Sequence, residues 1–345
     1  MTIGNFKIDS KSKTFIIAEL SANHNGSKEI ALETVRAAKR AGADCIKLQT
    51  YTPDTITINC QREDFMINGT IWDGENLYKL YEKAYTPWEW HKDIFECAKK
   101  EEIECFSSPF DKTAVDFLET LDTPAYKIAS FEITDIPLIK YTASQGKPII
   151  ISTGVASHED IDLAVKTCRS VGNNKIALLK CTSSYPSPIE EANISMIADL
   201  STKYDVISGL SDHTMGDTVP IISIAFGAKI IEKHFILDKS IGGPDSSFSM
   251  DEKEFTIMVK NIRDAESAIG KIDYTLTPKQ IKGREHSRSL YVVKGIKKGD
   301  IITTSNVRSI RPGYGLHPKN YNLILGKKVN CDLKKGDRFE LKYIK

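Results

Sequence analysis

Short β-branched segments alternate with longer segments of helical periodicity along the first 270 residues, and this alternation constrains the fold more than any other feature of the chain. Apolar residues recur at helical spacing in residues 30–41, 91–100, 161–171 and 252–269. Strands separated by helices pair in parallel, because a parallel connection needs a long crossover. Eight such units predict an α/β fold, the (β/α)8 TIM barrel, which takes about 250 residues. The expected strands are residues 14–18, 44–48, 103–107, 125–128, 148–152, 176–180, 205–209 and 228–233.

A doubly wound open sheet is the alternative α/β fold. It is less favoured, because no G-x-G-x-x-G motif follows the first expected strand. Residues 51–87 are too many for an ordinary loop between a strand and its helix, so we expect them to cap the barrel or to contact a partner. Ser27 and Ser157 directly precede helical segments and are expected to cap them.

Charge is distributed unevenly along the chain: residues 281–345 carry a formal charge of +11 and the residues before them −10. This predicts a boundary near residue 280 and electrostatic attraction between the two parts. We expect a barrel domain at residues 1–270, a linker at 271–283 and a small β-rich domain at 284–345. The expected strands of the small domain are residues 289–293, 300–303, 306–310, 327–329 and 338–341.

The composition excludes several classes of protein. With 41% hydrophobic and 27% charged residues, the chain is a folded protein rather than a disordered one. No apolar run reaches the roughly 18 to 20 residues of a membrane helix, and the N-terminus has no signal-peptide core. The seven cysteines form no C-x-x-C pair, which fits free thiols in the cytoplasm. The cations of the C-terminal region are spread evenly, so we expect no nucleic-acid partner.

Polar residues follow the expected strands, at the end of the barrel where TIM-barrel active sites lie. One polar residue after a strand is commonly a helix cap, but a polar residue after every strand indicates a shared site. These residues are Glu19, Lys47, Gln49, Ser108, Lys127, Ser130, Thr153, Thr182, Ser183, Tyr185, Ser211, His213 and His234.

Two of these residues, His213 and His234, follow neighbouring strands and are candidate ligands of a divalent metal ion. Without a carboxylate beside them, they indicate an exchangeable ion rather than a structural one. The alternative is that one histidine caps a helix and the other is a satisfied core residue. His24, after the first strand, competes for the role of ligand.

Lys47 and Lys127 lie at strand ends in apolar surroundings, where a charged amine needs a compensating anion. Either could form a Schiff base with a carbonyl substrate. Two lysines among several hydroxyl groups are more typical of a clamp for a phosphate or carboxylate, which is the favoured interpretation.

The same strand ends carry motifs that resemble the sialic acid synthase family, in the right order along nearly the whole chain. The C-terminal segments resemble the antifreeze-like (SAF) domain of that family, and within the family the chain is most similar to the pseudaminic acid branch. Ser183 stands where sialic acid synthases have asparagine in a C-T-N-x-Y-P motif, which fits a different sugar. The motifs are IAELSANHNG (17–26), IKLQT (46–50), FSSPFD (106–111), YKIASFEI (126–133), STG (152–154), CTSSYP (181–186), GLSDHT (209–214), EKHF (232–235), GGPDSSFSM (242–250), SRSLYVVKGIKKGD (287–300) and SIRPGYG (309–315).

The resemblance implies a carbon–carbon bond-forming transferase. It would condense phosphoenolpyruvate with 2,4-diacetamido-2,4,6-trideoxy-L-altrose, giving pseudaminic acid and phosphate by C–O cleavage. Phosphoenolpyruvate would be held by Lys47, Lys127, Ser130, Thr153, Ser183 and Ser211, to which we add Ser108 as a further substrate-binding residue at a strand end. The sugar would face Gln49, Glu132, Tyr185 and Asp245.

The resemblance also implies a cofactor and a partner. His213 and His234 would hold a divalent cation (manganese, magnesium or cobalt), and Glu19 would deprotonate the attacking water. Arg311 would reach the sugar from the other chain of a domain-swapped homodimer. The alternatives are a sister synthase making N-acetylneuraminic or legionaminic acid, and a sugar-binding module without catalysis.

Overall fold

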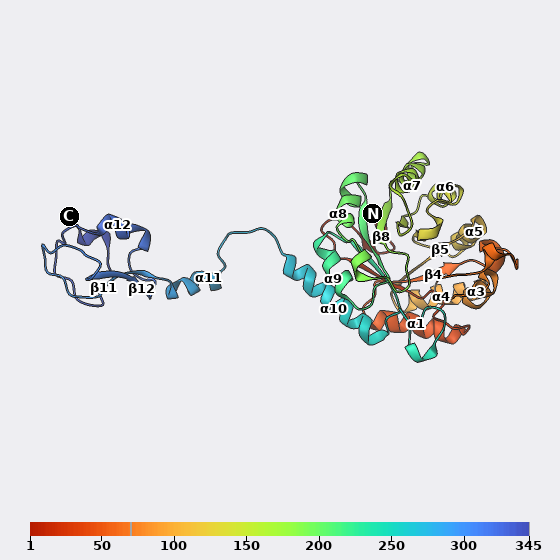
Figure 1. Ribbon diagram of the computed structural model, residues 1–345, viewed down its shortest axis with the longest axis horizontal. Coiled ribbons are helices and arrows are strands. Elements are labelled where there is room, and N and C mark those ends of the chain that lie inside the picture. Colours follow the sequence, from red (N-terminus) through yellow and green to blue (C-terminus); the bar gives the residue numbers. More distant parts are fainter. Residues whose placement is uncertain (70, 345) are drawn as a thin grey trace. The chain divides into compact units, whose positions relative to one another are not determined.

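Eight parallel strands close into a barrel in the order β10-β3-β4-β5-β6-β7-β8-β9 (Figure 1). The structure is a computed structural model that describes residues 1–69 and 71–344. The predicted TIM barrel is confirmed, and each observed strand overlaps its expected segment. The strands are β3 (Phe15–Glu19), β4 (Cys45–Thr50), β5 (Glu104–Pro109), β6 (Tyr126–Ile128), β7 (Ile149–Ser152), β8 (Ile176–Cys181), β9 (Ile207–Asp212) and β10 (Ile230–His234).

Helices surround the barrel, at least one after each strand (Figure 1). They form where an apolar stripe can pack on the sheet and a polar side chain can cap the first turn. The side chains of Ser27 and Ser157 accept the predicted capping bonds at α1 and α7. The helices are α1 (Lys28–Arg40), α2 (Pro53–Ile56), α3 (Leu77–Ala84), α4 (Trp88–Lys100), α5 (Lys112–Thr120), α6 (Ile136–Ser144), α7 (His158–Ser170), α8 (Met196–Tyr204), α9 (Thr218–Ala225) and α10 (Glu252–Ile269).

Side chains alternate between the barrel interior and the helix layer along each strand. On β3, Phe15 and Ile17 belong to the interior cluster, whereas Ile16 and Ala18 pack with the helices. A hairpin that the sequence analysis did not predict, β1 (Thr2–Ile3) and β2 (Phe6–Lys7), adds Ile3 to the interior cluster. The interior below the carboxyl ends of the strands is therefore filled with apolar side chains.

The chain divides into two units, Met1–Gly270 and Lys271–Lys345. In the second unit, β11 (Ser289–Val292) and β12 (Val307–Ile310) pair antiparallel, and the helices are α11 (Pro278–Gly283) and α12 (Tyr321–Ile324). Three further segments expected as strands, residues 300–303, 327–329 and 338–341, form only isolated bridges. That expectation was wrong in extent, because each segment makes only single bridge contacts and no continuous ladder. Part of the expected linker is helical, since the Thr277 side chain caps α11.

Two expectations from the composition are compatible with the structure. All seven cysteines are unpaired. Within residues 1–69 and 71–344, no helix combines the length and the apolar character that crossing a membrane requires.

Candidate active site at the carboxyl end of the barrel

The last interior layer of the barrel is polar. Strand register places Glu19 beside Lys47 on β4 and beside His234 on β10, and it places Ser211 beside Glu232. These residues share the inward parity of Phe15 and Ile17, so their side chains point into the barrel above the apolar interior. The sequence therefore builds an ionic layer on an apolar base.

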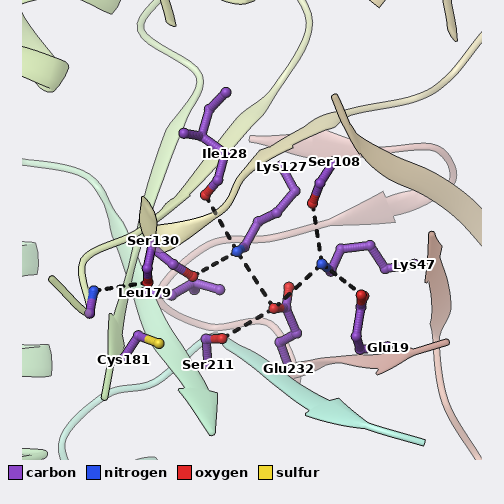
Figure 2. A network of polar contacts seen from close by, with 12 residues as sticks. Glu19, Lys47, Ser108, Lys127, Ile128, Ser130, Leu179, Cys181, Ser211 and Glu232 are labelled. Atoms are coloured by element: carbon purple, nitrogen blue, oxygen red, sulfur yellow. Dashed lines mark hydrogen bonds and ion pairs between the residues drawn. The ribbon is translucent and has the colours of Figure 1, made fainter. Parts of the chain in front are cut away.

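Lys47 lies between two buried carboxylates (Figure 2). Its Nζ is 2.7 Å from Glu19 Oε2 and 3.7 Å from Glu232 Oε1, and it donates a hydrogen bond of 3.3 Å to Ser108 Oγ. Gln49 donates to Glu19 Oε1 at 3.1 Å. Although burial disfavours its charge, the nearby carboxylates raise the pKa of the Lys47 amine. Lys47 is therefore protonated at neutral pH.

Lys127 approaches the same carboxylate from β6. Its Nζ is 3.5 Å from Glu232 Oε1 and donates to Ser152 Oγ at 2.7 Å, and Ser211 Oγ donates to Glu232 Oε1 at 3.1 Å (Figure 2). Burial lowers the pKa of the Lys127 amine, which Glu232 counteracts. Glu232 thus bridges both lysines.

The ionisation of the carboxylates in this layer determines whether it can bind an anion. Burial raises the pKa of Glu19 to about 7, with repulsion from Glu232 adding to it and Lys47 opposing it. Burial acts in the same direction on Glu232, but Lys127 and Lys47 hold the pKa of its carboxyl below the ordinary value. Two lysine amines therefore face two carboxylates, one of which, Glu19, has a pKa of about 7. A pair of lysine amines at one place suits a bound phosphate or carboxylate.

The two histidines lie together at the mouth, with ring centroids 5.3 Å apart. His213 Nδ1 lies 2.9 Å from the carbonyl oxygen of Thr182, so Nδ1 carries a hydrogen and Nε2 is available to a ligand when the ring is neutral. Among the described residues, the buried His234 Nδ1 has no hydrogen-bond partner, and it is 3.8 Å from Asp245 Oδ2. Burial lowers the pKa of the His234 imidazole well below its usual range, so the ring is neutral.

This donor set fits a divalent cation that takes its remaining ligands from water or substrate. Within residues 1–69 and 71–344, no group of three or more histidine, cysteine, aspartate or glutamate residues forms a complete metal site. His24 is engaged elsewhere: its Nδ1 accepts from the Gly26 amide at 3.1 Å, and its Nε2 lies 3.2 Å from Thr86 Oγ1.

A buried ion pair outside the barrel interior holds the loop that carries His213. Lys233 Nζ is 2.5 Å from Asp212 Oδ2 and donates to the carbonyl oxygens of Thr214 and Gly216. Lys233 precedes His234 in the chain, and Asp212 precedes His213. The pair therefore fixes the two imidazole-bearing strand ends relative to each other.

A cavity of about 810 Å³ opens above the ionic layer. The residues expected to face the sugar, Gln49, Glu132, Tyr185 and Asp245, all line it, together with His234 and Ser183. The Tyr185 ring lies 4.5 Å from that of His213, which places it directly beside the histidine pair. Residues of the long segment 51–87 form much of the remaining lining, as its length suggested.

The hydroxyl groups expected to bind phosphoenolpyruvate have different partners. Ser130 Oγ accepts from the Gly154 amide at 3.0 Å, and a Cβ at Gly154 would lie 2.2 Å from Ser183 Oγ. The Thr153 hydroxyl donates to the carbonyl of Leu179 at 3.1 Å, away from the lysines. Arg311 lies in the second unit, directly after β12, and is exposed.

Comparison with known proteins identifies the family of this chain. The model of the NeuB family matches residues 34–274, and that of the SAF domain matches residues 287–338. The chain belongs to the NeuB family. It is 52% identical to the pseudaminic acid synthase of Campylobacter jejuni, over 98% of both chains. It is 50% identical to that of Helicobacter pylori, over 92% of this chain and 94% of that one.

A solved relative supports the fold. The N-acetylneuraminic acid synthetase of Leptospira borgpetersenii, crystallised with citrate, is 32% identical and superposes with a TM-score of 0.73, covering 82% of this chain and 94% of that one. The relatives named in these comparisons are synthases, so this NeuB protein is an enzyme.

Sequence reasoning missed several residues of the NeuB site. Glu232 is the most important, since it contacts both lysines and Ser211. The signal was present in the string E-K-H, where Glu232 and His234 share inward parity while Lys233 faces out. Ser152 was missed for the same reason: it is the inward-facing residue of β7 and accepts a hydrogen bond from Lys127, while the predicted role of its neighbour Thr153 stays a prediction.

Glu132 provides a pH-dependent prediction. Its Oε2 is buried without a hydrogen-bond partner among the described residues, and burial raises the pKa of the carboxyl to about 7. Between the unfolded value of 4.5 and pH 7, the folded state holds a proton that the unfolded state has lost, so the free energy of unfolding falls as pH rises. Glu132→Gln should remove this penalty, making the variant relatively more stable at pH 8 by about 1–3 kcal/mol.

The measurement is thermal unfolding of both proteins at pH 4.5 and pH 8. The prediction concerns only the change in their stability difference between the two pH values. An identical difference at both would show that Glu132 ionises normally.

Proposed function

We propose that this enzyme condenses phosphoenolpyruvate with 2,4-diacetamido-2,4,6-trideoxy-L-altrose, giving pseudaminic acid and phosphate. The observation that carries the proposal is the pair of buried lysines, Lys47 and Lys127, at the strand ends that also supply the lining of a large pocket. His234 lines this pocket, and the His213 ring lies beside it. Lysines so placed suit a small polyanion, and the pocket above has room for a sugar. The identity of 50–52% to pseudaminic acid synthases supports the choice of sugar.

Lys47 and Lys127 bind the anionic groups of phosphoenolpyruvate, with Ser211 and Ser152 beside them. Lys47 has carboxylate partners that raise its pKa, which argues against a Schiff-base role, because a Schiff base requires a neutral amine. Burial lowers the pKa of Lys127, whose amine is paired with Glu232 and donates to Ser152 Oγ. Glu232 holds the two ammonium groups together and stabilises their charge when the anion is absent.

His213 and His234 would hold a divalent cation, with manganese, magnesium or cobalt as candidates. When bound, such a cation supplies Lewis acidity to a carbonyl oxygen. Gln49, Glu132, Tyr185 and Asp245 line the pocket beside them and orient the sugar so that its aldehyde carbon faces phosphoenolpyruvate. This orientation brings the reacting carbons together at low entropic cost.

The bond changes follow from this placement. Carbon 3 of phosphoenolpyruvate forms a bond to the aldehyde carbon, whose oxygen becomes a hydroxyl on protonation. Water adds to carbon 2, and phosphate leaves by cleavage of the bond between carbon 2 and the bridging oxygen. Glu19 takes the proton from the water: its pKa of about 7 suits a group that accepts and returns a proton near neutral pH.

The experiment supplies phosphoenolpyruvate and manganese with one sugar at a time and measures phosphate release. The panel contains the diacetamido-L-altrose sugar, its legionaminic acid counterpart and N-acetylmannosamine, with each product identified by mass spectrometry and NMR. Highest kcat/KM with the first sugar is expected. Preference for either other sugar would assign the chain to a sister synthase, and no turnover with any would support a binding module.

We also propose a homodimer in which the second unit of one chain completes the site of the other through Arg311. The support is the charge of +11 on residues 281–345 against −10 on the rest, together with the exposure of Arg311 and of the apolar residues Ile272 and Tyr274 of the same unit. The guanidinium fork suits the carbonyl oxygen of an acetamido group.

Mixing an Arg311→Ala chain with a Lys47→Ala chain should restore activity, because each mixed dimer then has one intact site. With random exchange, half of the dimers are mixed, so recovery of about a quarter of wild-type activity is expected. Each variant alone is the control. Mass spectrometry should first demonstrate that the subunits exchange. If activity then does not recover, Arg311 acts within its own chain's site or outside any site.

A further inference from the structure

One face of α3 is apolar and lines the pocket. Leu77, Leu80, Tyr81 and Ala84 follow at intervals of three, one and three residues, which places them on a single stripe of the helix. Such a stripe on a surface helix normally packs into the core. Here none of the four is fully buried or belongs to a hydrophobic core cluster, and all four line the pocket.

The stripe is part of a larger surface, the apolar wall, to which the segments after β4 and β5 also contribute. The Tyr51 ring contacts the Tyr81 ring at 5.6 Å and the Phe110 ring at 5.1 Å, both edge to face, so the aromatic part is held in a fixed arrangement. The apolar wall consists of Tyr51, Leu77, Leu80, Tyr81, Ala84 and Phe110.

The polar side chains of the pocket come from the segments at the strand ends, whereas segment 51–87 adds further apolar residues to the lining, among them Ile56, Ile67 and Ile71. Gln49, Glu132, Asp245 and His234 line the part at the strand ends, next to the ionic layer. A molecule that fills the pocket therefore meets polar side chains at the reacting end and hydrocarbon at the other. An open-chain hexose that presents its aldehyde carbon, C1, to the strand ends has C6 as its most distant carbon.

We propose that the apolar wall binds the C6 methyl group of the sugar, so that the enzyme selects 6-deoxy hexoses over their 6-hydroxy counterparts. The inference rests on the proposed function. A methyl group gains free energy when it leaves water for the wall. A C6 hydroxyl would lose its water against Leu77, Leu80, Ala84 and Phe110, which offer no side-chain hydrogen-bonding atom to replace it. Within the wall, polar side-chain atoms are confined to the hydroxyls of Tyr51 and Tyr81.

The test compares 2,4-diacetamido-2,4,6-trideoxy-L-altrose with the same sugar carrying a hydroxyl at C6. The wild type should prefer the methyl sugar by about 10- to 100-fold in kcat/KM. Leu80→Asn should raise the KM for the methyl sugar and reduce this preference by about tenfold, leaving the KM for phosphoenolpyruvate unchanged. Ala84→Leu, which adds bulk without polarity, should raise the KM for both sugars.

Leu163→Asn is the matched control, since Leu163 is also on a helix surface, 50% exposed on α7, and does not line the pocket. It should leave the preference unchanged, and melting temperatures check that each variant is folded. If the wild type turns over both sugars and Leu80→Asn does not change the ratio of their kcat/KM values, the inference is overturned, and the proposed function remains intact. Turnover of neither sugar by the wild type would instead overturn the proposed function. Should Leu80→Asn not fold, an unchanged sugar KM in Ala84→Leu would overturn the inference by itself.

Discussion

Lys127→Met is expected to lower kcat/KM for phosphoenolpyruvate by about 10²–10³-fold, mostly through a higher KM. Methionine keeps the length and the apolar stem of lysine but removes the ammonium group that faces Glu232 Oε1 at 3.5 Å and Ser152 Oγ at 2.7 Å. Only Lys47 then remains to compensate both Glu232 and an incoming anion. Binding of the anion should weaken, because a charge-assisted contact in a water-excluded site has no substitute.

Lys180→Met is the matched control for this experiment. Lys180 is also a buried lysine, on β8, which is separated from β6 by β7. Its Nζ donates to the carbonyl of Cys181 and to Thr182 Oγ1, outside the ionic layer. Its replacement should leave the KM for phosphoenolpyruvate within about threefold of wild type. A double variant, Lys127→Met with Glu232→Gln, separates the effect of the lysine charge on stability from its effect on catalysis. Glu232→Gln removes the carboxylate that Lys127→Met leaves without its partner, so the double variant should be more stable than Lys127→Met. It should not regain activity, because the ammonium group is still absent. Equal losses in Lys127→Met and Lys180→Met would show that Lys127 acts only through the fold.

Replacing either histidine of the pair, His213→Ala or His234→Ala, is expected to abolish turnover and to remove a manganese-binding step seen by calorimetry. The two rings are 5.3 Å apart, and each retains a nitrogen suited to coordination. One imidazole alone binds a divalent cation weakly, so the loss of either should eliminate measurable affinity at micromolar metal. Because both residues lie at strand ends, the barrel should remain folded.

His158→Ala serves as the control, since His158 is exposed at the start of α7 and does not line the pocket. It should bind manganese as the wild type does. The metal assignment fails if metal-free protein, prepared with a chelator, is fully active, or if both histidine variants bind manganese with unchanged affinity.

The sequence predicted the barrel correctly, because its signals are local and repeat eight times. Each β-branched segment and its following amphipathic helix specify one unit, and parallel pairing with helical crossovers allows few other arrangements. The antifreeze-like region was less well predicted: its segments are short and pair through single bridges such as Ile301 with Lys328, which sequence periodicity cannot detect. The hairpin at Ile3 and Phe6 was missed because two-residue strands have no period at all.

The sequence by itself determined which residues stand at the carboxyl ends of the strands, since parallel strands bring those ends to one face of the barrel. Only the tertiary structure decided which of them meet. Side-chain parity turns Glu232 and Ser152 inward and Lys233 outward, and barrel closure brings β10 beside β3, so that Glu232 reaches lysines on β4 and β6. The apolar face of α3 was equally visible as a pattern, but whether it packs on the core or lines the pocket depends on where the 51–87 segment folds back. Contacts between residues more than a hundred positions apart are set by closure of the barrel, and no local pattern in the chain encodes them.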